Sequence, residues 1–252
     1  MPSLEVRSER GVRGYWVGTT QYPRVTAVLD AIHKPALERW KLEHEQKAFY
    51  ESAVKTFDEC VASGTCSSIR FRTMMQHDLN EAKKAERAQM AAAEAGTRVH
   101  AHIAARLRGE TRPDDLSETE LIQSDYAVDW MQETGAVPVA IEEAVYWDAN
   151  GRGFAGTPDV VVDFPDTARV VVDWKTGAGK VWNSYHLQNV AYRRAWNWMH
   201  KAEITRPCTG GMIVRLPQAP DEPVEVVPVV SENELFLVFL ACLRIYEWSK
   251  EE

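Results

Sequence analysis

The chain has 252 residues, of which 45% are hydrophobic and 26% are charged, and its formal net charge at pH 7 is −8. This length and composition are ordinary for a soluble globular protein with a sizeable core. No stretch approaches the ~20 apolar residues that a membrane-spanning helix needs. The first residues lack the apolar run of a secretory signal. We therefore expect a cytoplasmic protein without a membrane partner.

The acidic total hides an uneven distribution of charge. Residues 69–108 contain eight Lys and Arg against four Asp and Glu, whereas residues 110–170 contain three Arg against fourteen Asp and Glu. A basic segment can follow phosphates and an acidic one can hold a metal, although each can also be a solvated face. The net charge therefore does not exclude a nucleic-acid partner.

The four cysteines are Cys60, Cys66, Cys208 and Cys242. They form no CxxC pair, and no His lies at zinc-finger spacing from them. An iron–sulfur cluster usually takes several ligands from one short segment, which this spacing does not offer. We expect buried or half-buried free thiols and no iron–sulfur cluster.

The first half of the chain is predicted to be mostly helical. Helices are expected over residues 26–32, 35–62 and 78–95, over a segment that begins at Thr97 and carries His100, and over residues 118–135. Thr26 is a candidate N-cap, Pro35 suits a first helical turn, and Gly96 is a candidate helix stop. Residues 117–120 (Ser-Glu-Thr-Glu) have the capping-box pattern.

From about residue 137 the chain becomes rich in Val and aromatic residues, as strands are. Strands are expected over residues 137–147, 154–163, 169–174, 211–216 and 224–229, and helices over 184–199 and 231–248. Turn residues at Asn150-Gly151 and at 164–167 would join the first three strands into an antiparallel meander. Residues 231–234 (Ser-Glu-Asn-Glu) have a second capping-box pattern.

This order of elements predicts an α/β fold of mixed α+β type. We expect a single domain over residues 1–252, with a mainly helical region over 1–95 and the catalytic core over 96–252.

Three side chains suited to phosphodiester chemistry fall on the second and third strands of the meander. If the turn is centred near residue 166, Asp159 lies opposite Asp173. Strand side chains alternate, so Lys175 shares a face with Asp173 while Trp174 points to the other side. A slip of one residue would scatter the group.

Two facing carboxylates repel each other, and a divalent cation such as Mg²⁺ or Mn²⁺ would compensate them. Such a cation can polarise a phosphate and lower the pKa of a bound water, and Lys175 can then orient that water. The alternative for these residues is a surface ion pair, which stabilises little. The Asp159, Asp173 and Lys175 pattern is a weak signal by itself. Together with the neighbouring sequence segments, it favours metal-assisted phosphodiester hydrolysis.

Four segments, in this order, resemble the PD-(D/E)xK nuclease superfamily, in particular its RecB-like and phage-type exonuclease branch. They are Gly96-Thr-Arg-Val-His100, Gly156-Thr-Pro-Asp159, Asp173-Trp-Lys-Thr-Gly177 and Gln188-Asn-Val-Ala-Tyr192, and Tyr22-Pro-Arg-Val-Thr26 with Lys34-Pro-Ala-Leu37 is similar to the N-terminal region of phage members. The resemblance covers roughly residues 22–196. It implies a restriction-endonuclease-like core, with a central mixed sheet flanked by helices, and a metal-dependent DNA exonuclease.

The resemblance also assigns roles to single residues. Asp159 and Asp173 would be metal ligands together with the backbone carbonyl of Trp174, and Lys175 would be the catalytic lysine. His100 would complete the metal shell from its helix. His102 is a rival for that role. Family members often have Glu where this chain has Ala104. This departure weakens the expectation that the helix carrying His100 takes part in metal binding.

Further roles follow from the same resemblance. Glu142 would assist the metal or the water, and since Glu143 points the opposite way, only one of the two can face the site. Gln188 and Tyr192 share a helix face and would contact the substrate near the scissile phosphate, with Thr176 beside them. The alternative places Tyr192 in the core and Gln188 in solvent.

The implied substrate is DNA, either linear duplex or single-stranded ends, and Trp182 could stack on a base there. Resemblance to phage members implies a single-strand annealing protein as a partner and the host cytoplasm as the location. Some superfamily members form rings around DNA, which leaves a homo-oligomer open. Two alternatives remain: a structure-specific endonuclease on the same core, and a catalytically inactive DNA-binding module.

Overall fold

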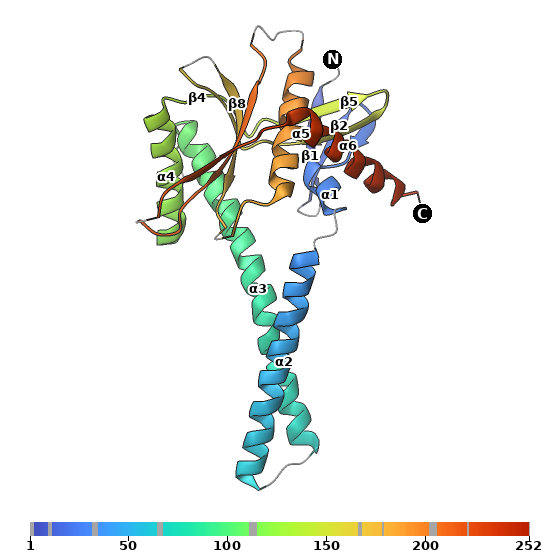
Figure 1. Ribbon diagram of the computed structural model, residues 1–252, viewed down its shortest axis with the longest axis vertical. Helices are drawn as coiled ribbons and strands as arrows, with labels where there is room; N and C mark the ends of the chain where they lie inside the picture. Colours follow the sequence, from blue (N-terminus) through green and yellow to red (C-terminus); the bar gives the residue numbers. More distant parts are fainter. Residues whose placement is uncertain are drawn as a thin grey trace. The chain divides into compact units, whose positions relative to one another are not determined.

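The computed structural model describes the backbone of residues 3–9, 12–31, 35–64, 68–110, 115–165, 168–177, 179–201, 206–220 and 222–251. The chain divides into two compact units, one of Met1–Ile32 with Gly96–Glu252 and the other of His33–Ala95. The helices are α1 (Val25–Asp30), α2 (Pro35–Ser63), α3 (Ser68–Leu107), α4 (Glu118–Thr134), α5 (Asn183–Met199) and α6 (Glu232–Trp248) (Figure 1).

Ten strands accompany these helices in the described residues. They are β1 (Leu4–Glu9), β2 (Val12–Val17), β3 (Thr20–Tyr22), β4 (Val137–Ile141), β5 (Val145–Ala149), β6 (Arg152–Gly156), β7 (Val160–Asp163), β8 (Arg169–Lys175), β9 (Gly210–Arg215) and β10 (Glu225–Pro228). Five of them form the central sheet in the order β10-β9-β8-β7-β4. Its pairs are antiparallel except β8 with β9, which is parallel, so the sheet is mixed.

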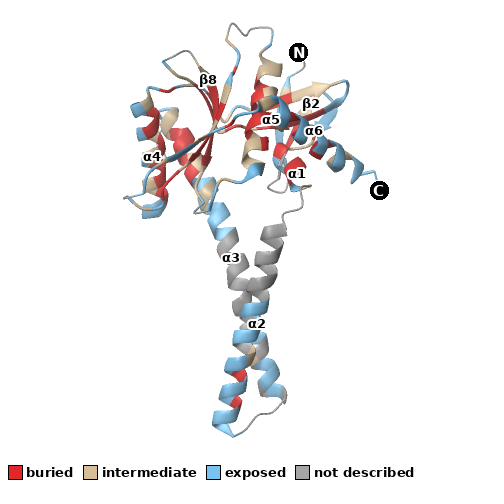
Figure 2. Ribbon diagram, viewed as in Figure 1, coloured by how far each residue is buried: buried red, intermediate tan, exposed pale blue. Residues whose placement is uncertain are grey.

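Both faces of the central sheet are covered by helices (Figures 1 and 2). On one face, Val161 and Val171 pack with α5 and α6 in the larger core cluster. On the other, Val160, Val172 and Trp174 pack with α4 and with the part of α3 that follows Gly96. The near-continuous Val runs of β7 and β8 reflect burial on both sides. The predicted fold class is confirmed: a mixed α/β chain with a helix-flanked mixed sheet, as in restriction-endonuclease-like folds.

The predicted register of the β7–β8 hairpin is confirmed. Val160 pairs with Val172 and Asp163 with Arg169, so the positions of each pair are centred on residue 166. At the turn end, Arg169 Nε donates to Asp163 Oδ1 at 2.8 Å, and Nη2 donates to Oδ2 at 2.9 Å. This bidentate pair ties the two strands together at the end opposite the candidate site. Residues 166–167 of the predicted turn lie outside the described residues.

Two of the long predicted strands are each broken in two. The segment 137–147 divides into β4 and β5 around Glu142, which has φ +50°, and the segment 154–163 divides into β6 and β7 around Asp159. β5 and β6 pair as a separate hairpin joined at Asn150-Gly151, whereas β4 pairs with β7 in the central sheet. Composition marks extended segments but does not show where they change sheet.

The predicted helix boundary at Gly96 is wrong, because α3 continues through it. A Cβ at residue 96 would lie 2.9 Å from Thr176 Oγ1, so the glycine permits close approach of the β8–α5 loop. Thr97 therefore caps no helix. Thr26 does not cap α1 either, since that helix begins at Val25.

The first half of the chain was predicted to be mostly helical. The structure shows that it also contains a three-stranded sheet of β1, β2 and β3, which the prediction missed. Of the two predicted capping boxes, the one at Ser117 is confirmed, with Glu120 as its partner. The one at Ser231 is wrong: this residue has φ +56°, and its side chain makes no capping hydrogen bond.

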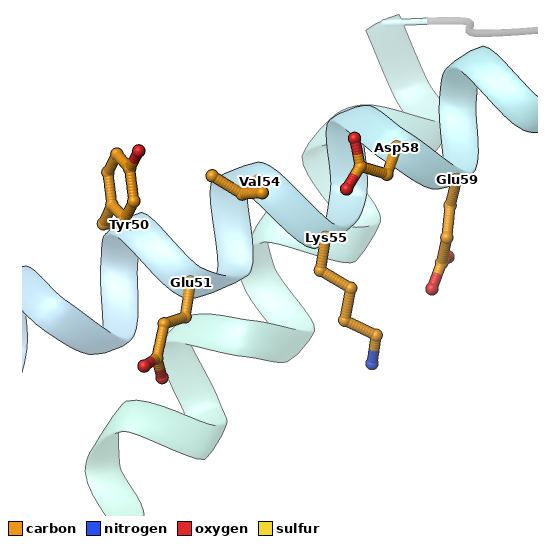
Figure 3. Close-up of a pocket in the computed structure, with 6 residues that line it drawn as sticks. All are labelled: Tyr50, Glu51, Val54, Lys55, Asp58 and Glu59. Carbon is orange, nitrogen blue, oxygen red and sulfur yellow. The ribbon is translucent and has the colours of Figure 1, made fainter.

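The second unit consists of α2 and the first part of α3. Thr56 and Cys60 of α2 are buried, whereas Tyr50, Val54, Phe57 and Val61 form an exposed apolar stripe. A surface hollow on α2 is lined by Tyr50, Glu51, Val54, Lys55, Asp58 and Glu59 (Figure 3). It contains none of the candidate site residues.

Cys60, Cys208 and Cys242 are buried free thiols, and Cys66 lies outside the described residues, as does Lys34 of the resemblance. Within the described parts of the chain, no helix combines the length and apolar character needed to cross a membrane.

Candidate active site

The predicted carboxylates and lysine meet where β7 begins and β8 ends. Asp159 lies on the bend immediately before β7, and Asp173 and Lys175 are on the last part of β8. The β7–β8 pairing ends at Val160 with Val172, so Asp159 comes next to the segment that carries Asp173. The Trp174 backbone N–H donates to Asp159 Oδ2 at 2.8 Å. Trp174 itself points into the opposite core cluster, as alternation predicts.

His100 of α3 approaches the same carboxylate. Its Nδ1 lies 2.9 Å from Asp159 Oδ1, so both oxygens of Asp159 are engaged. Its rival His102 instead places Nδ1 2.7 Å from Ser124 Oγ on α4 and is buried away from the carboxylates. The structure thus distinguishes two histidines that lie only two positions apart.

Lys175 forms an ion pair with Asp173. The Lys175 Nζ lies 2.6 Å from Asp173 Oδ2, and the side chain of Asp173 is only 2% exposed. The ammonium group of Lys175 thus compensates a deeply buried carboxylate. The pairing is therefore not the exposed kind that contributes little.

Burial raises the pKa of Asp173 to about 6, with the nearby Asp159 adding to the rise and Lys175 opposing it. Burial also disfavours the charge of Asp159, but His100 and Lys175 outweigh it and lower the pKa of that carboxyl. The pKa values of His100 and Lys175 are raised, since Asp159 and Asp173 respectively overcome the effect of burial. The four groups thus form one coupled cluster in which opposite charges alternate.

Gln188 and Tyr192 of α5 extend the cluster. Lys175 Nζ lies 3.4 Å from Gln188 Oε1, and Gln188 Nε2 donates to Tyr192 Oη at 3.2 Å. Tyr192 is buried in the core, and burial raises its pKa. A Cβ at Gly156 would lie 2.5 Å from Tyr192 Cε1, so this glycine leaves room for the ring. Tyr192 therefore packs in the core, as the alternative expected, and its hydroxyl accepts from Gln188. Contact of this pair with substrate stays a prediction.

Tyr185 was missed by the sequence reasoning. The Lys175 Nζ lies 4.5 Å from the centroid of its ring, a cation–π distance. Tyr185, Gln188 and Tyr192 are spaced by three and four residues and so share one face of α5, a signal that could have revealed it. Tyr15 was also missed: its hydroxyl lies 2.8 Å from Thr157 Oγ1, two residues before Asp159.

The carboxylates of Glu142 and Glu143 are directed to other partners in the described residues. The Glu142 N–H donates to the Asp159 carbonyl at 2.9 Å, but its carboxylate lies 3.8 Å from Arg108 Nη2. Glu143 pairs with His200 at 3.3 Å. The Thr176 carbonyl accepts from the side-chain amides of Gln123 and Gln218 at 2.9 and 3.1 Å, which holds the start of the β8–α5 loop.

The donor set suits a hard divalent cation. No three His, Cys, Asp or Glu side chains in the described residues are grouped so that they could hold a metal ion. Mg²⁺ nevertheless needs only one or two carboxylates, completing its shell with water and substrate phosphates. Asp159 and Asp173 supply these carboxylates at one end of the β7–β8 hairpin, beside the ammonium group of Lys175. The residues present therefore fit the predicted ion.

No protein-family profile matches the chain, and no curated protein sequence matches it. Among solved structures, it is similar to SSO0001 at 13% identity with a TM-score of 0.32, over 51% of this chain and 56% of that one. It is also similar to a candidate exonuclease from Eubacterium rectale at 8% identity with a TM-score of 0.41, over 61% and 68% of the two chains. The chain thus matches little more than half the length of SSO0001. Both likenesses are too weak to carry an inference about function.

Proposed function

We propose that this protein is a metal-dependent DNA exonuclease of the RecB-like PD-(D/E)xK type. The observation that carries the proposal is the meeting of Asp159, Asp173 and Lys175 at one end of the β7–β8 hairpin, with Lys175 Nζ 2.6 Å from Asp173. His100 and Gln188 reach the same place from α3 and α5. Segments far apart in the chain thus contribute groups to one place, which supports the roles that the resemblance assigns to them.

The chemistry follows from these side chains. Asp159 and Asp173 would bind the cation, which supplies charge to the scissile phosphate and lowers the pKa of the attacking water. Lys175 keeps a raised pKa and is 18% exposed, so it is a charged donor at the edge of the site. It can hydrogen-bond to the water or to the phosphate oxygens while negative charge develops. Gln188 and Tyr185 hold its ammonium group in place.

The first test is digestion of end-labelled linear duplex DNA with Mg²⁺ or Mn²⁺, with EDTA as the metal-free control. We expect nucleotides to be released from the ends and the release to stop with EDTA. The Lys175→Ala variant should lose activity by about 10²- to 10³-fold, as loss of a preorganised donor does. Asp159→Asn and Asp173→Asn should be at least as inactive.

Lys201→Ala is the matched control, because Lys201 is an exposed lysine that lies over Trp198 near the other end of α5. This variant should retain full activity. Cleavage of a covalently closed circle would favour an endonuclease instead. Full activity of Lys175→Ala, with unfolding temperatures that match those of the unchanged protein, would refute the proposal.

A further inference from the structure

Trp182 is unusual among the described tryptophans because its side chain is exposed beside the candidate site. It is 43% exposed, whereas Trp130, Trp174 and Trp196 are buried. The preceding Val181 packs against the larger core cluster. The loop is thus anchored by Val181 and presents the indole of Trp182 to solvent. Core packing does not account for a large aromatic side chain at this position.

The position of Trp182 is fixed relative to the candidate catalytic lysine. Trp182 is the N-cap residue of α5, and its carbonyl accepts a hydrogen bond from the Tyr185 N–H at 2.9 Å. The Tyr185 ring in turn lies 4.5 Å from Lys175 Nζ. Trp182 is therefore attached one helical turn before Tyr185, whose ring lies against the lysine.

A second group on the same loop complements the indole. The Lys180 Nζ lies 4.8 Å from the Trp182 ring centroid, and Lys180 is itself exposed. An aromatic plane next to an exposed ammonium group matches the two parts of a nucleotide, since the base can stack and the phosphate can pair with the lysine. A paired terminal base is held by its partner and by the next pair, so turning it onto the indole costs unpairing and unstacking energy, and an unpaired nucleotide avoids this cost.

We infer that Trp182 and Lys180 form a subsite for an unpaired nucleotide next to the bond that is cut. This inference rests on the proposed nuclease function and makes it more specific. The protein then acts preferentially on single-stranded or frayed DNA ends, because these present a base that can leave its stack at low cost. Fully paired blunt ends must first lose a pair before they can use the subsite.

The test compares kcat/KM for two end-labelled substrates with Mg²⁺, a single-stranded oligonucleotide and a blunt duplex of the same sequence. Trp182→Ala should lower kcat/KM on the single strand by about 5- to 140-fold, the range for loss of one stacked base. The loss should appear mainly in KM, and the blunt duplex should be affected less. Trp182→Phe should restore most of the activity, and Lys180→Ala should weaken binding more at low salt than at high salt.

Trp248→Ala is the matched control, since Trp248 is 63% exposed at the end of α6. It should leave both substrates unaffected. If Trp182→Ala changes neither substrate, or lowers both equally, the subsite is refuted while the nuclease function stands. If the unchanged protein cleaves neither substrate, the proposed function fails and the subsite fails with it.

Discussion

At the scale of single residues, the site depends on buried charges that compensate one another. Asp159 bonds to His100 and to the Trp174 N–H, while Asp173 pairs with Lys175. Each carboxylate would be costly to bury alone, and removing one partner of such a pair costs more than the pair contributes. Tyr192, for which Gly156 leaves room, bonds to Gln188, and Gln188 in turn accepts from Lys175.

Gly156→Ala should disturb the site without touching a charge. The added Cβ would lie 2.5 Å from Tyr192 Cε1, and overpacking of this kind costs about 1–3 kcal/mol. We expect a lower free energy of unfolding and weaker activity, because Tyr192 holds Gln188. Gly177→Ala, which meets open space, is the stability control. Equal unfolding temperatures for the two variants would contradict the close packing of Gly156 against the Tyr192 ring.

Asp163 should make stability depend on pH. Its hydrogen bonds to Arg169, and then the charges of Arg169 and Arg206, lower its pKa. A lowered pKa contributes stability above the unfolded-state value of about 3.9, and this is lost as the pH falls through the native value. Asp163→Asn should therefore cost about 1–2 kcal/mol at pH 7 and progressively less below about pH 4.

Chemical denaturation of Asp163→Asn and of the unchanged protein, from pH 7 to below pH 4, measures the difference in their free energies of unfolding. Glu5→Gln is the control, since the Glu5–Arg7 pair is more than half exposed, and it should change little at any pH. A difference between Asp163→Asn and the unchanged protein that stays constant down to pH 3 would contradict the assignment.

At the scale of elements, helix ends and strand breaks position the site. The bend at Asp159 separates two strands of different sheets, and α3 continues through the predicted stop at Gly96. The two predicted capping boxes have nearly the same sequence pattern, yet only Ser117 caps its helix. Ser231 follows β10 closely and adopts a left-handed conformation, while Glu232 after it pairs with Arg193 and Arg194.

These two serines form a matched pair of variants. Ser117→Ala removes a side chain that accepts from the Glu120 N–H and should cost about 1 kcal/mol. Ser231→Ala removes no capping bond and should cost much less. Thermal unfolding compares the two, and equal destabilisation would show that the hydrogen bond at Ser117 is unimportant.

Gly96 allows a test of the contact between α3 and the loop after β8. Alanine is favoured over glycine in a helix by about 1 kcal/mol, but here its Cβ would meet Thr176 Oγ1. Gly96→Ala should therefore stabilise the Thr176→Ala background by about 1 kcal/mol and the unchanged protein by less. A double-mutant cycle of unfolding free energies measures this coupling. Strictly additive effects would argue against the contact.

At the scale of the whole molecule, the two units differ in how much they bury. β8 is paired on both sides, by β7 and β9, and residues 170–174 are all buried. Much of α2 is exposed in its described part, including the apolar stripe from Tyr50 to Val61. Elements with few buried contacts open locally at lower free energy than the core does.

Native-state hydrogen exchange should separate the two units. Amide protons of β8 and α5 should exchange only through global unfolding, whereas those of α2 should exchange faster and with a weaker dependence on denaturant. Mass spectrometry of proteolytic fragments after exchange measures both. Protection of α2 equal to that of β8 would mean that α2 unfolds together with the core.

The sequence by itself determined the mixed α/β class, most helices, and the register that puts Asp159 opposite the end of β8. These follow from local patterns: periodicity of apolar residues, turn residues and the alternation of strand side chains. Only the tertiary structure decided that His100 and not His102 reaches Asp159, that Tyr185 lies over Lys175, and that Gly96 and Gly156 permit close approach. It also decided where the long strands change sheet. The reason is physical: each of these outcomes depends on which distant segment packs against the residue, and no local pattern contains that partner.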